Sequence, residues 1–86
     1  MAVCLRSSEG ESNAMTRDVS SNGMFLSTRS KLTVDSAVEL EARIPLGNSA
    51  FPAMPILYAG RVVRVEVLTS DEFGIAVCFS RYEYLV

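Results

Sequence analysis

The sequence contains no histidine, and this absence removes more function classes than any residue that is present. Histidine is the commonest general base in enzymes and the commonest protein ligand of metal ions. Most hydrolase and metalloenzyme mechanisms are therefore excluded, and we expect neither catalytic nor metal-binding residues. Ser20 lies near Asp18, but no histidine or evident lysine base is available to activate its hydroxyl as a nucleophile.

Cysteine is also scarce, with Cys4 and Cys78 as the two examples in the chain. They are too few and too far apart in sequence to indicate a disulfide framework or a zinc knuckle. We expect two free, largely buried thiols that pack as small apolar residues. A disulfide between two neighbouring strands is the alternative.

Long hydrophobic runs are missing, since none approaches the roughly 18 residues that a membrane-spanning helix needs. The segment 1–6 has no basic lead and no long apolar stretch, so it does not resemble a signal peptide. We therefore expect a cytoplasmic location and no membrane insertion. The 86 residues are 49% hydrophobic with a net charge of −2, which is typical of a globular protein and predicts one domain over residues 1–86.

Alternation of apolar and polar residues is abundant, and it is typical of half-buried β-strands. In the run 38–46 the apolar face consists of Val38, Leu40, Ala42, Ile44 and Leu46. In the runs 59–68 and 73–79 the apolar faces consist of Val63, Val65 and Val67, and of Phe73, Ile75, Val77 and Phe79. Shorter strands are expected over 2–6, 13–19 and 24–27. Six strands without a convincing long helix predict an all-β fold, a small antiparallel barrel.

Polar clusters separate the expected strands. Residues 7–10, 21–23 and 69–72 predict compact turns, and 28–36 predicts a longer connection. The segment 47–55 contains two prolines and is expected to be the most mobile loop. Ser80 and Glu83 have the spacing of a helix capping box, which predicts at most one helical turn. Tyr82 and Tyr84 are expected to cover the open end of the barrel, or else to form an interaction patch.

One polar corner has a distinctive spacing, Asp18-x-Ser20-x-x-Gly23, and an apolar run follows it at once. Two short side chains with hydrogen-bonding oxygens stand two residues apart. The glycine can adopt a positive φ and turn the chain into the next strand. This corner is either a hairpin turn that satisfies its own backbone or a small polar cradle for the edge of a ligand.

The chain resembles the PilZ family, bacterial domains known as receptors for the second messenger cyclic di-GMP. The resemblance extends over about residues 15–79, and its motifs are the Asp18–Gly23 corner, the charged alternating strand, Gly60-x-Val62-x-Arg64 and the run 74–79. It implies a six-stranded antiparallel barrel, a C-terminal helix that is absent or truncated here, and no catalytic activity. It also implies that Asp18, Ser20 and Gly23 bind the guanine base: the carboxylate accepts from guanine donors, the hydroxyl donates or accepts, and the glycine lets the backbone approach. Arg64, on the polar face of its strand, is a further candidate.

The family's second ligand element is an Arg-x-x-x-Arg pair just before the first strand, whose guanidinium groups bind phosphates and stack on guanine. Residues 1–86 contain no such pair, because Arg6 has no partner at that spacing and neither Arg17 nor Arg29 lies at the family's position. Two functions remain as alternatives. One is a cyclic di-GMP receptor, of weak affinity as long as the arginine segment is missing, that repositions an attached effector domain. The other is a degenerate, ligand-independent adaptor for a protein partner.

We expect no cofactor besides this ligand. A nucleic acid polymer is not an expected partner, because the net charge is negative and the strand phenylalanines point inward.

Overall fold

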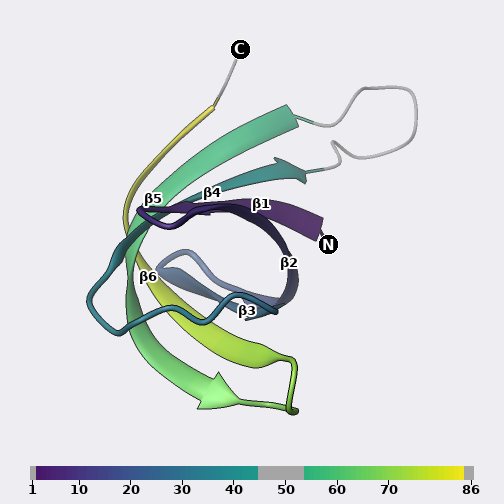
Figure 1. The fold of residues 1–86 in the computed structure, drawn as a ribbon. Coiled ribbons are helices and arrows are strands. Elements are labelled where there is room, and N and C mark those ends of the chain that lie inside the picture. Colours follow the sequence, from purple (N-terminus) through teal and green to yellow (C-terminus); the bar gives the residue numbers. More distant parts are fainter. Residues whose placement is uncertain (1, 45–53, 85–86) are drawn as a thin grey trace.

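The computed structural model describes residues 2–44 and 54–84, which form six antiparallel strands in a closed barrel (Figure 1). The strands are β1 (Ala2–Ser7), β2 (Gly10–Val19), β3 (Gly23–Thr28), β4 (Ala37–Ile44), β5 (Met54–Val67) and β6 (Phe73–Tyr84). Their order around the barrel is β1-β2-β3-β6-β5-β4, and pairing of β1 with β4 closes it. The prediction of an all-β, six-stranded antiparallel barrel is confirmed.

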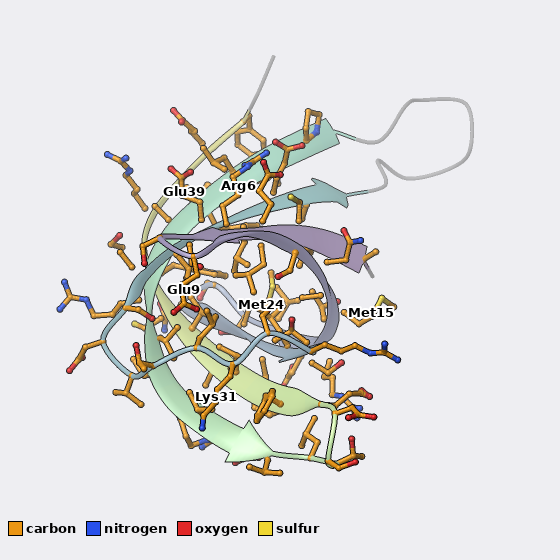
Figure 2. The ribbon with its side chains drawn as sticks, viewed as in Figure 1. Arg6, Glu9, Met15, Met24, Lys31 and Glu39 are labelled. Carbon is orange, nitrogen blue, oxygen red and sulfur yellow. The ribbon has the colours of Figure 1, made fainter. Side chains whose placement is uncertain are left out.

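The barrel interior is filled by alternate residues of every strand, because a closed sheet has one inner face to bury. The largest fully buried side chains are Leu5, Leu26, Leu40, Val62 and Ile75. Figure 2 shows an inner and an outer position: Met24 of β3 points into the barrel, whereas Met15 of β2 lies outside it and is exposed.

The predicted inner faces of β4 and β6 are confirmed for the side chains that the structure describes. Val38, Leu40 and Ala42 are buried, while the predicted places of Ile44 and Leu46 lie outside the described side chains. In β6, Ile75 and Val77 are buried, and Phe73 and Phe79 pack against the core.

Strand β5 departs from simple alternation at Val63. Its register against β6 shifts between Val62 and Arg64, so Val63 is the extra residue of a β-bulge. Val62 is fully buried, Val63 is 52% exposed, and Val65 packs against the core. Val67 faces solvent at the strand end, with 74% of its surface exposed. The predicted apolar face is therefore wrong at Val63 and Val67 and confirmed at Val65.

The C-terminal part of β6 is a strand and not a helical turn. It pairs with β5 as far as Tyr84, and the Ser80 hydroxyl donates to the carbonyl of Ala59 (3.1 Å). The predicted cap at Ser80 is therefore wrong, because strand pairing occupies the backbone that a helix would need. Within residues 2–44 and 54–84, no helix is long and apolar enough to cross a membrane.

Three tyrosines gather where the first half of β5 pairs with the C-terminal part of β6. Tyr58 is nearly buried, and burial, with smaller effects of Tyr84 and Tyr82, raises its pKa. Tyr82 lies 6.2 Å from Tyr58 between ring centroids, and Tyr84 meets Tyr82 edge-on. Both Tyr82 and Tyr84 remain more than half exposed and form an exposed aromatic pair.

The turn predictions are met where the structure describes them. In the turn 69–72, the Thr69 hydroxyl accepts hydrogen bonds from the backbone N–H groups of Asp71 and Glu72 (3.2 and 3.1 Å). The predicted mobile loop 47–55 lies outside the described residues as far as residue 53, and β5 begins at Met54.

Candidate functional site

Ser20 closes the corner between β2 and β3. Its N–H donates to the carbonyl of Gly23 (2.9 Å), and its hydroxyl accepts from the N–H groups of Asn22 (3.3 Å) and Gly23 (3.2 Å). The N–H of Phe79 donates to the carbonyl of Asn22 (2.8 Å) and ties the corner to β6. The Ser20 side chain thus satisfies the backbone of its own turn, as a serine does in many turns.

Gly23 is required for close packing. It pairs with Cys78 of β6, and a Cβ at this position would collide with the carbonyl oxygen of Val77. Among the described glycines, a positive φ is found at Gly10 and not at Gly23. The missing side chain lets β3 approach β6, whereas the positive φ that the sequence suggested is not used.

Asp18 differs from Ser20, because its carboxylate has no hydrogen bond or ion pair with any described residue. It pairs with Phe25 of β3 after a register shift at Arg17. Phe25 points outward, since its neighbours Met24 and Leu26 are buried in the core. Directly opposed residues of an antiparallel pair share a face, so Asp18 projects from the outer wall with both oxygens free to accept.

Asp18 begins a row of outward residues that crosses four neighbouring strands. The row consists of Asp18 (β2), Phe25 (β3), Ala76 (β6) and Arg64 (β5), each paired in register with the next. At the usual strand spacing its ends are about 14 Å apart. The structure therefore brings Asp18 and Arg64 to one face, with an aromatic ring and a small residue between them.

Arg64 lies over Phe25, with its guanidinium carbon 5.6 Å from the ring centroid. Its Nε lies 3.1 Å from Oε1 of Glu66, in an ion pair whose two side chains are both largely exposed. The ring of Phe25 in turn lies against Gly74, where a Cβ would collide with it. The guanidinium of Arg64 therefore lies within cation–π distance of a flat aromatic ring.

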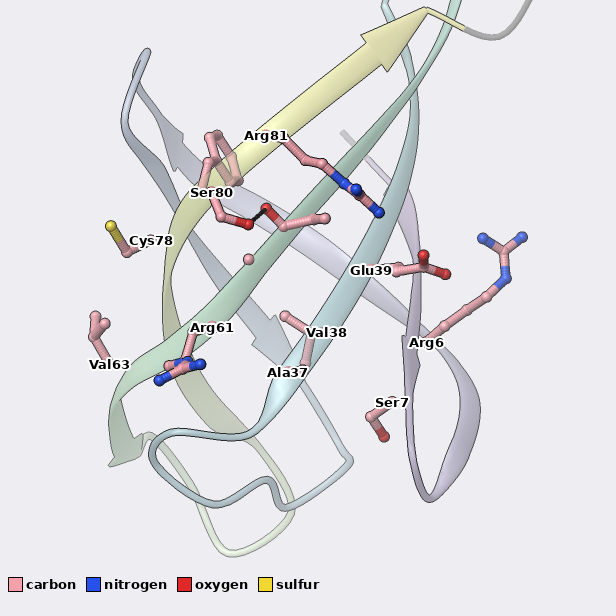
Figure 3. Close-up of a pocket in the computed structure, with 13 residues that line it drawn as sticks. Arg6, Ser7, Ala37, Val38, Glu39, Arg61, Val63, Cys78, Ser80 and Arg81 are labelled. Carbon is pink, nitrogen blue, oxygen red and sulfur yellow. Dashed lines mark hydrogen bonds between the residues drawn. The ribbon is translucent and has the colours of Figure 1, made fainter.

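The neighbouring row contains Gly23, Cys78, Arg61 and Ala37, again paired in register across β3, β6, β5 and β4. Cys78 and Arg61 also line a groove of about 830 Å³ over β4, β5 and β6. Figure 3 shows Arg61, Val63 and Cys78 on one side of this groove, with Glu39 and Arg6 on the other. Cys78, which lines this groove, pairs with Gly23 of the motif corner.

The two cysteines are free, as predicted, but their environments differ. Cys4 is half-buried and its thiol donates to Oε1 of Glu11 (3.4 Å); burial first, and then this hydrogen bond, raises its pKa. Cys78 is exposed on the outer wall beside Gly23. The expectation of a buried thiol is wrong for Cys78, because alternation along β6 turns it away from the core.

Arg6 is already engaged on its own part of the barrel. Its Nη2 donates to Oε1 of Glu41 (3.2 Å), and its Nε lies 3.7 Å from Oε1 of Glu11. The hydrogen bond to Glu41 raises the pKa of Arg6 further above its usual value. No group of three or more acidic or cysteine side chains within the described ranges is placed to hold a metal ion.

Arg61 is a residue of this outer wall that the sequence analysis did not single out. In a regular strand, residues three apart point to opposite faces, so Arg61 and Arg64 could not both lie on the outer wall. The bulge at Val63 places both on the outside. The sequence contains no clear signal for this bulge apart from the doublet Val62-Val63 between the two arginines.

The family model for the PilZ domain matches residues 1–83. Comparison with curated proteins gave no match, and neither did comparison with solved structures. PilZ domains are binding and receptor modules for cyclic di-GMP and not enzymes. Because the match covers nearly the whole chain and the barrel carries the Asp-x-Ser-x-x-Gly corner, the chain belongs to the PilZ domain family.

Proposed function

We propose that this protein is a cyclic di-GMP-binding signalling module in which Asp18 recognises a guanine base. The observation that carries the proposal is the exposed carboxylate of Asp18, which has no partner among the described residues and shares a face with Phe25 and Arg64. A carboxylate accepts two hydrogen bonds at once and therefore matches the two adjacent N–H donors on the Watson–Crick edge of guanine. Membership of the family supports the ligand class.

The other predicted residues have distinct parts in this site. Ser20 and Gly23 fix the shape of the corner, Ser20 through its hydrogen bonds to the turn and Gly23 through its close approach to β6. Arg64 reaches from β5 across the row and places a planar cation over Phe25, where it can stack on a base or pair with a phosphate. The output passes to a protein partner or to an attached effector domain.

Replacement of Asp18 by alanine tests the proposal. We expect the affinity for cyclic di-GMP, measured by calorimetry on the full chain, to fall about tenfold or more, because charge-assisted hydrogen bonds to the base are lost. Asp71→Ala is the matched control, since Asp71 is an exposed acid in the turn at the far end of β6. Asp18 would not be a ligand residue if its replacement changed the affinity no more than the replacement of Asp71.

A second candidate function is a ligand-independent adaptor. It is favoured by the exposed pair of Tyr82 and Tyr84 and by the engagement of the Ser20 hydroxyl within its own turn. This function predicts a protein partner whose binding is indifferent to nucleotide. A nucleotide interaction that is lost in Asp18→Ala and Ser20→Ala, with the fold intact, contradicts it.

A further inference from the structure

We propose that Arg61 and Arg64 form a phosphate-binding pair on the outer wall of the barrel, which holds the phosphodiester of a ligand whose base is bound at Asp18. The proposal rests on the function proposed above for the location of the base. The phosphates are assigned to arginines of the barrel wall. Residues 1–86 contain no two arginines four positions apart, the spacing of the family's phosphate-binding pair.

The bulge at Val63 creates the pair. Arg61 pairs with Cys78 and Arg64 with Ala76, two adjacent outward positions of β6, while Val63 has no partner in the register. β-Bulges are frequent beside functional sites, where the extra residue redirects a side chain. In β5 the extra residue turns two arginines at an i, i+3 spacing to the same face.

Both arginines lie on the outer face of β5, which β6 alone separates from β3 and the motif corner. Gly23 and Arg61 flank Cys78 in one row, which places their Cα atoms roughly 10 Å apart at the usual strand spacing. Phe25 and Arg64 flank Ala76 in the next row. The side chain of Arg64 crosses Ala76 toward the ring of Phe25, whereas the small, exposed side chain of Cys78 leaves the wall between Gly23 and Arg61 open to a flat ligand.

The positive charges of Arg61 and Arg64 are available to bind an anion. Arg61 is exposed and forms no ion pair with any other described residue. Arg64 is paired with Glu66, but an exposed ion pair contributes little and can be exchanged for a phosphate. Arg81 adds a further guanidinium to the groove and extends toward the side on which Glu39 lies, opposite Arg61 (Figure 3).

Guanidinium chemistry matches the ligand class. Each arginine presents parallel N–H donors that bind two oxygens of a phosphate at once, and it keeps its charge at any relevant pH. Arg64, supported by Phe25, is preorganised, whereas Arg61 borders an open groove. The pair therefore fits a phosphodiester that projects from a base held at Asp18 toward β5.

Calorimetric titration of the full chain with cyclic di-GMP tests the pair through Arg61→Ala, Arg61→Lys and Arg64→Ala. We expect about a tenfold or larger loss of affinity in each alanine variant, and only partial recovery in Arg61→Lys, because lysine cannot form the bidentate contact. Arg29→Ala, an exposed arginine just beyond the opposite end of β3 from Gly23, removes the same charge and should leave the affinity unchanged.

A second measurement separates the two proposals. The Nε–Hε signals of Arg61 and Arg64 are followed by NMR while inorganic pyrophosphate is added, a probe that carries no base. Shifts of both signals, with Arg29 unmoved, support the phosphate pair even if cyclic di-GMP fails to bind, an outcome that would overturn the proposed function alone. Tight binding of cyclic di-GMP that is as strong in Arg61→Ala as in Arg29→Ala overturns the pair alone. Absence of both responses overturns both.

Discussion

Asp18 and Ser20 share one short motif but differ in what their oxygens already bind. The Ser20 hydroxyl is engaged by two backbone N–H groups of its own turn, whereas the Asp18 carboxylate is free on the outer wall. The motif spacing predicts a polar corner, but it does not decide between a turn that satisfies its own backbone and a cradle for a ligand. The choice depends on where each side chain points. For Asp18 this direction follows from the bulge at Arg17, which alternation in the sequence does not reveal.

The two thiols provide a test at the same scale. We expect a thiol reagent to modify Cys78 well before Cys4, because Cys78 is exposed, while burial raises the pKa of Cys4 and so lowers its thiolate fraction. Cyclic di-GMP should slow the modification of Cys78, which lies between Gly23 and Arg61, and leave Cys4 unaffected. Mass spectrometry of partially labelled protein measures both rates. Equal protection of the two cysteines, or of neither, contradicts the location of the ligand.

At the scale of the strands, the sequence predicts where β-structure occurs but not where its register changes. Every expected strand exists, since alternation reports directly on burial, as the runs around Leu40 and Ile75 illustrate. A bulge adds one residue and shifts the alternation of inward and outward side chains. Simple alternation therefore predicts Val63 on the inner face and gives no reason to select Arg61. Strand β6 also extends through Ser80, because pairing with β5 outweighs a local capping pattern.

The pairing of β3 with β6 depends on the missing side chain of Gly23. Gly23→Ala would drive a methyl group into the carbonyl of Val77, and we expect the free energy of unfolding to fall by about 1–3 kcal/mol. Urea denaturation measures this change. Ser21→Ala, at an exposed position of the same turn, is the control and should change the stability by no more than about 0.5 kcal/mol. A fully stable Gly23→Ala variant would show that the corner and β6 are not closely packed.

At the scale of the whole molecule, closure of the barrel turns the core residues of its strands inward. The residues of the proposed site are those that alternate with the core residues and lie on the outer wall. Asp18 on β2 and the arginines on β5 are distant in sequence, and only the order β2-β3-β6-β5 brings them onto adjacent rows. That order follows from long-range strand pairing, which a local pattern does not encode.

The most direct test of the account compares cyclic di-GMP with cyclic di-AMP by calorimetry on the full chain. The two ligands share their phosphodiester ring, but guanine offers two adjacent donors to the Asp18 carboxylate, whereas adenine places an acceptor opposite it. We predict measurable binding of cyclic di-GMP and binding of cyclic di-AMP that is weaker by a factor of about ten or more. Equal affinities for the two ligands, or no binding of cyclic di-GMP, would contradict the account.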